Sequence, residues 1–147
     1  HSVHIDDLAA AFAAVPGRSE ALGQAYNAVG QEAMTFNGYV ALIASIMGVD
    51  AEVVQVGARD YEAMLEEIAS IKGAEIFDYD WRESRIFSNE KLRRELDWSP
   101  RYDMREGLEM TYRWWLVQGL DREPWDFRAD DLAFAWLADH ADSSKEA

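Results

Sequence analysis

Short β-branched stretches alternate along this chain with longer segments whose apolar residues recur every three or four positions. The stretches Val3–Ile5, Gln24–Val29 and Glu52–Val56 have the composition of strands, and a further one is expected at Arg85–Phe87. Strands that alternate with helices are typical of an α/β chain. Because the expected strands are few and short, they make a poor sheet by themselves, and about six helices account for most of the remaining sequence.

Start and stop signals bound these helices. Thr35 is expected to cap a helix that Gly48 ends, and Asp103 with Glu106 forms the pattern of a capping box. The other expected helices are one from Asp6 or Asp7 to Pro16–Gly17, one from Asp60 to Gly73, one after Ser88 that ends at Leu96, and one after Asp130. We predict a structured region over residues 1–140 and a flexible tail over 141–147.

The charge balance excludes several classes of function. Among 147 residues, 28 are acidic and 14 are basic, which gives a net charge of −14. Such a charge repels phosphate, so nucleic acid and anionic membranes are disfavoured as partners. With no cysteine, the chain has no disulfide, thiolate metal site or cysteine nucleophile. The apolar runs are shorter than the ~18 residues of a membrane span, and we expect a cytoplasmic protein.

Catalytic and cofactor motifs are missing from the sequence. It contains no Gly-x-Gly-x-x-Gly, no phosphate-binding loop of the Walker type, no Tyr-x-x-x-Lys and no Gly-x-Ser-x-Gly. No catalytic or cofactor-binding residue is therefore expected in this chain.

The strongest candidates for ligand contact lie in an aromatic segment. Trp81, Arg82 and Arg85 are the residues we predict to bind a substrate, because guanidinium groups among aromatic rings suit anion or ligand contacts. Surface ion pairing is the competing interpretation. The sequence His4-Ile5-Asp6-Asp7 has metal-ligand spacing, but helix caps and ordinary hydrogen bonds explain it better, and no metal site is expected.

Several motifs in a fixed order resemble those of a known family. In chain order they are Val3-His4-Ile5-Asp6-Asp7-Leu8-Ala9, Ala25-Tyr26-Asn27-Ala28-Val29-Gly30, the helix from Thr35 to Gly48, Asn89-Glu90-Lys91, Glu95-Leu96-Asp97-Trp98-Ser99-Pro100 and Glu106-Gly107-Leu108. This order resembles the C-terminal half of extended short-chain dehydrogenases/reductases, the NAD-dependent epimerase/dehydratase family. The stretch Asp126–Leu132 is similar to the tail of its epimerase-like branch, which includes the chloroplast stem-loop RNA-binding proteins.

The resemblance implies a Rossmann-type parent of which this chain is the substrate-binding part. An N-terminal half would carry the NAD or NADP loop and the catalytic Tyr-x-x-x-Lys, and this chain alone would be inactive and bind neither cofactor. The expected partners are that half, a small molecule such as a sugar, and a second copy of the chain in a homodimer. The alternative is a fragment of an epimerase-like RNA-binding or scaffold protein without catalysis. The chain begins at His1 rather than methionine, which fits a fragment.

Overall fold

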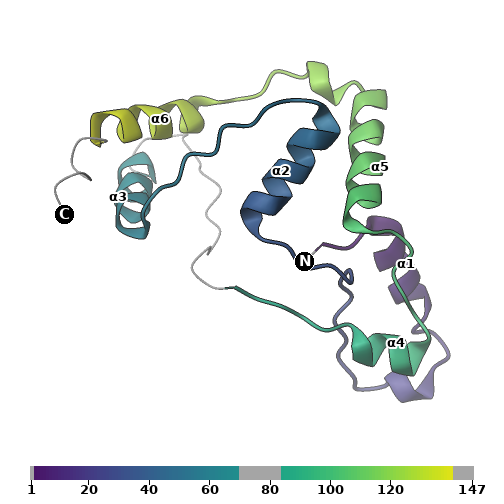
Figure 1. The fold of residues 1–147 in the computed structure, drawn as a ribbon. Coiled ribbons are helices and arrows are strands. Elements are labelled where there is room, and N and C mark those ends of the chain that lie inside the picture. The colour runs from purple at the N-terminus through teal and green to yellow at the C-terminus, as the bar shows by residue number, and fades with distance from the viewer. Residues whose placement is uncertain (1, 70–83, 141–147) are drawn as a thin grey trace. The chain divides into compact units, whose positions relative to one another are not determined.

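The computed structural model describes residues 2–69 and 84–140, and it divides the chain into two compact units (Figure 1). Unit 1 consists of His1–Val53 and Arg85–Arg122, and unit 2 consists of Val54–Ser84 and Glu123–Ala147. The helices of unit 1 are α1 (Ile5–Ala13), the short 3₁₀ helix η1 (Ser19–Ala21), α2 (Phe36–Met47), α4 (Glu90–Leu96), α5 (Met104–Val117) and η2 (Leu120–Arg122). Unit 2 contains α3 (Ala58–Ala69) and α6 (Arg128–His140).

A small apolar cluster holds unit 1 together. Ala11 of α1 packs against Leu92 and Leu96 of α4 and against Trp98, and all four side chains are buried. Tyr26 and Ala28 pack against the same cluster from an extended segment. Elsewhere in unit 1, α2 lies beside α5.

The α/β prediction is wrong for the part of the chain that the structure describes, because no residue there is in a β-strand. The stretches at residues 3, 24–29, 52–56 and 85–87 are non-helical and do not form a β-ladder, and α1 begins directly at Ile5. A strand needs a neighbouring backbone to complete its hydrogen bonds. In residues 2–69 and 84–140, the one backbone–backbone hydrogen bond between the regions of these stretches runs from Gly30 N to Ser2 O, at 2.9 Å.

Side chains satisfy the backbone of residues 24–30 in place of a sheet. Asn89 Nδ2 donates to Val29 O at 2.7 Å, and Lys91 Nζ donates to Ala25 O at 3.2 Å. The alternation of apolar and polar residues in this segment therefore has a cause other than pairing, because Tyr26 and Ala28 face the cluster next to α4. The Rossmann-type architecture expected from the resemblance is likewise absent from the described residues.

Several helix boundaries agree with the sequence. Thr35 Oγ1 accepts from Gly38 N at 3.1 Å, and Gly48 ends α2 in the left-handed region at φ 69°. Both hydrogen bonds of the Asp103–Glu106 capping box are present. Three helices begin earlier than predicted: α1 is capped by His4, α3 starts at Ala58 and α6 starts at Arg128.

Unit 2 is built on the contact between α3 and α6. Met64 and Ile68 of α3 are buried, as their helical spacing predicts. Trp136 of α6 donates through Nε1 to Glu67 at 2.9 Å, and its ring stacks on His140.

Candidate functional site

The first element of the site is Asp7, a buried carboxylate in the first turn of α1. Its Oδ1 accepts from Nε of Arg101 at 2.9 Å, and its Oδ2 accepts from the backbone amides of Arg101 at 2.9 Å and Tyr102 at 3.2 Å. Trp98 Nε1 donates to the carbonyl oxygen of Asp7 at 2.9 Å. Together these bonds fix residues 98–102 against α1.

The protonation state of Asp7 follows from these contacts. Burial raises the pKa of the Asp7 carboxyl group. The hydrogen bonds from Arg101 and Tyr102, together with the charge of Arg101, lower the pKa by more than burial raises it, so the pKa of Asp7 lies below its ordinary 3.8. The pKa of Arg101 is raised by the same hydrogen bond. The pair is therefore ionised at neutral pH.

A second set of contacts fixes the beginning of α5. Asp103 accepts from Glu106 N at 2.8 Å, and Glu106 accepts in return from Asp103 N at 3.0 Å. Glu32, in the loop after Gly30, accepts from Met104 N at 2.7 Å. The loop and the helix start are thereby held together, and the carboxylates lie at the positive end of the helix dipole, where negative charge is stabilised.

Between these fixed elements lies a cavity of about 930 Å³, contained within unit 1. Its walls come from residues 2–6, the loop 30–32, Tyr39 of α2, residues 100–104 and the face of α5 that ends at Trp114. Cavities that bind small molecules commonly measure about 300–1,000 Å³. The volume therefore suits a small molecule, and apolar and polar side chains both line it.

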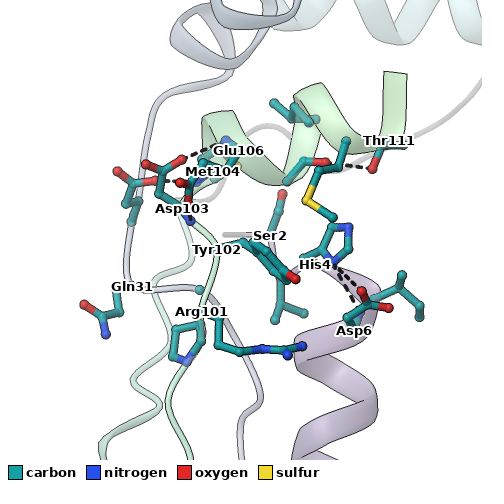
Figure 2. A pocket seen from close by; sticks show the side chains of 18 of the residues that line it. Ser2, His4, Asp6, Gln31, Arg101, Tyr102, Asp103, Met104, Glu106 and Thr111 are labelled. Carbon is teal, nitrogen blue, oxygen red and sulfur yellow. Dashed lines mark hydrogen bonds and ion pairs between the residues drawn. The ribbon is translucent and has the colours of Figure 1, made fainter. Parts of the chain in front are cut away.

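His4 is the histidine among the residues that line this cavity (Figure 2). Its side chain is 9% exposed, and its ring meets the edge of the Tyr102 ring at a centroid distance of 4.8 Å. Nδ1 accepts from Asp6 N at 3.3 Å and so caps α1. Gly107 of α5 faces the ring, and a Cβ there would lie at ordinary contact distance, 3.6 Å from His4 Cδ2.

Negative charge dominates the cavity lining. Four carboxylates contribute to it, from Asp6, Glu32, Asp103 and Glu106, and Arg101 is the cation among the lining residues. Because Arg101 is paired with Asp7, its charge is largely compensated. The lining therefore disfavours a strongly anionic ligand.

The sequence candidates and the cavity are different sets of residues. Trp81 and Arg82 lie outside the described residues, and Arg85 is exposed and does not line the cavity, so the prediction that these three bind substrate stays a prediction. His4, Tyr102 and Trp114 were not predicted to bind a ligand. A sequence signal existed for His4, which directly precedes a helix with two acidic residues in its first turn.

The residues of the possible metal motif serve other purposes. His4 caps α1, Asp6 is exposed and Asp7 binds Arg101. Within residues 2–69 and 84–140, no three His, Asp or Glu side chains gather as ligands for a metal ion. In the same residues, no helix has the length and apolar character to cross a membrane.

The chain is similar to the chloroplast stem-loop binding protein of 41 kDa b from Arabidopsis thaliana. The two are 28% identical over 131 residues, a stretch that covers 88% of this chain and 32% of that protein. The chain thus spans about a third of the relative's length. No protein-family model matches the chain, and no solved structure matches it. The similarity is to a chloroplast stem-loop binding protein, the kind of protein to which the resemblance at Asp126–Leu132 pointed.

Proposed function

We propose that unit 1 is the ligand-binding part of an epimerase-, dehydratase- or reductase-like protein, and that its cavity receives a small hydroxylated molecule such as a sugar. The cavity of about 930 Å³ carries this proposal, because fixed polar contacts hold its walls at the Asp7 cluster and at the beginning of α5. The wall offers Tyr102 and Trp114 as aromatic surfaces and the carboxylates as hydrogen-bond acceptors for hydroxyl groups.

The described residues do not fit a dinucleotide cofactor. Pyrophosphate requires a glycine-rich loop or cationic groups, whereas this sequence has no such loop and the cavity lining holds four carboxylates. The NAD or NADP of a complete enzyme would be bound by residues beyond it, in the N-terminal partner half suggested by the resemblance.

Apolar side chains on the surface of unit 1 support a protein partner. Phe12 is 72% exposed, Leu22 78% and Ile86 76%. A nucleotide-binding half or a second copy would cover such groups. Sedimentation measures the homodimer directly, and a monomer at micromolar concentration would remove it from the proposal.

Stem-loop RNA binding is the second candidate, since the relative is named for binding a stem-loop. The net charge of −14 and the acidic cavity oppose contact with phosphate by this chain. An RNA-binding protein that performs no catalysis would depend on basic residues elsewhere, whereas a scaffold would not.

One experiment with two arms separates these functions. Ligand-detected NMR with D-glucose, D-galactose and D-mannose is expected to show binding, whereas NAD is expected to show none. In the second arm, filter binding of a stem-loop RNA over a salt series is expected to show no retention. Tight RNA binding that weakens steeply with salt, without sugar binding, would overturn the proposed function.

A further inference from the structure

One ring nitrogen of His4 has no partner among the described residues. Nδ1 accepts from the Asp6 amide and lies 3.9 Å from the Asp6 carboxylate, and no hydrogen bond of Nε2 accompanies these contacts. A neutral imidazole that accepts at Nδ1 carries its proton on Nε2. Nε2–H is therefore a hydrogen-bond donor that the described part of the protein leaves unused.

This donor belongs to a residue that lines the cavity. The His4 side chain is only 9% exposed. In the described part of the chain, no fully buried side-chain nitrogen or oxygen lacks a partner, so the unused Nε2 keeps some exposure to solvent. A donor held on a largely enclosed ring is suited to select a ligand atom, because its orientation is already fixed.

Contacts on several sides hold that orientation. The N-cap bond to Asp6 orients the ring, the edge contact with Tyr102 supports one side, and Gly107 of α5 lies next to the ring. Figure 2 shows the His4 ring between Tyr102 and α5, with its contacts to Asp6 below. Two segments that are far apart in the sequence therefore position the ring, because Asp6 belongs to α1 and Tyr102 directly precedes α5.

The charges around the cavity define what the donor can recognise. A phosphate or carboxylate on the ligand would meet Asp6, Glu32, Asp103 and Glu106, against the single compensated charge of Arg101. A neutral hydroxyl or carbonyl oxygen accepts from Nε2–H without that repulsion, and hydroxyl groups of the same ligand donate to the carboxylates.

We propose that His4 is a specificity-determining residue of this cavity, and that its Nε2–H donates to an uncharged hydroxyl or carbonyl oxygen of the bound small molecule. This inference rests on the proposed function, because it requires that the cavity binds a ligand. Beyond the proposed function, it names Nε2–H of His4 as the donor and states that phosphorylated ligands are excluded from the cavity.

The test uses the full chain, D-glucose, D-galactose and D-mannose as neutral probes, and glucose 6-phosphate as the charged probe. His4→Asn keeps a good N-cap residue, and His4→Phe keeps the ring against Tyr102, but both remove Nε2–H. Loss of one hydrogen bond is expected to weaken binding of the neutral probe roughly 3- to 10-fold in each variant. His140→Phe, in α6 of unit 2, is the matched control and is expected to bind like the wild type.

A second measurement does not depend on the variants. Long-range ¹H–¹⁵N correlation of the three histidines should show His4 protonated at Nε2, and the His4 Nε2 resonance should move when the neutral probe is added. Unchanged affinity in both variants, an unmoved Nε2 resonance, or tighter binding of glucose 6-phosphate would overturn the assignment while leaving sugar binding in place. If none of the neutral probes binds the wild type, the proposed function fails and this inference fails with it.

Discussion

The Asp7→Asn substitution measures how strongly one buried carboxylate holds unit 1 together. Asp7 accepts two backbone amides through Oδ2 and the Arg101 side chain through Oδ1. An asparagine oxygen can keep both amides, but its NH₂ group then faces the donor Nε of Arg101. The substitution therefore exchanges a charge-assisted hydrogen bond for two opposed donors.

The expected cost is about 2 kcal/mol in the free energy of unfolding, near the lower end of the ~1.5–3 kcal/mol range for a hydrogen bond to a charged group. The low end applies because the Arg101 side chain is 58% exposed and can bind water instead. Asp7→Leu removes every acceptor and leaves the amides of Arg101 and Tyr102 unsatisfied, so its cost is expected to reach about 4 kcal/mol.

Urea unfolding followed by tryptophan fluorescence gives the free energy, since Trp98 is 4% exposed and bonded to the Asp7 carbonyl. Hydrogen exchange of the Arg101 and Tyr102 amides reports on the same site without contribution from unit 2. The matched control is Asp6→Asn, at a carboxylate that is 57% exposed, which is expected to change stability by less than ~0.5 kcal/mol. Equal stability of Asp7→Asn and Asp6→Asn would refute this account of the cluster.

Three further outcomes follow from the described contacts. Hydrogen bonds lower the pKa of Asp7 in the folded chain, so its contribution to stability is present above its ordinary pKa of 3.8 and is lost as the pH falls through the lower folded value. Urea titrations at decreasing pH should show this loss of stability, and the loss should be smaller in Asp7→Asn. Gly30→Ala places a Cβ against the carbonyl oxygen of Ser2 and is expected to lower the free energy of unfolding by about 1–3 kcal/mol. Gly107→Ala places a Cβ within α5 at ordinary contact distance and should be neutral or stabilising by up to ~1 kcal/mol in the same urea assay. The reverse order of the two variants would contradict the geometry. Thr35→Ala removes the cap of α2 at a cost of about 1 kcal/mol, which Thr35→Ser should largely restore.

Local signals in the sequence were enough to place the helix ends that depend on neighbouring residues. Thr35 with Gly38, and Asp103 with Glu106, form their bonds within one turn, so their spacing alone predicts them. The cap of α1 was misplaced because Asp6 and Asp7 are better-known capping residues than His4. A contact with a distant residue decides the role of Asp7, because its carboxylate binds Arg101.

The strand predictions failed for a related reason. The alternation at Tyr26 and Ala28 is a property of the segment, but a ladder depends on a partner, and in the described residues α4 takes that place. The cavity was not predicted, because aromatic and arginine density at residues 81–85 is visible in a sequence, whereas the cavity brings His4 together with Tyr102 and Trp114 from a distant part of the chain. The prediction for residues 81–85 stays a prediction.

The bonds of Asp7 also set an order of events during synthesis. Trp98 and Arg101 are more than ninety positions away along the chain, so the ribosome must translate all of Val54–Ser84 before Asp7 can meet either of them. Until then the Asp7 carboxylate is hydrated, and Ala11 lacks its later neighbours Leu92 and Leu96 of α4. Contacts of such long range slow folding. The N-terminal segment of the nascent chain therefore lacks its packing partners until the last third of the protein has been synthesised. During that interval its apolar side chains are most accessible to a chaperone or a partner chain.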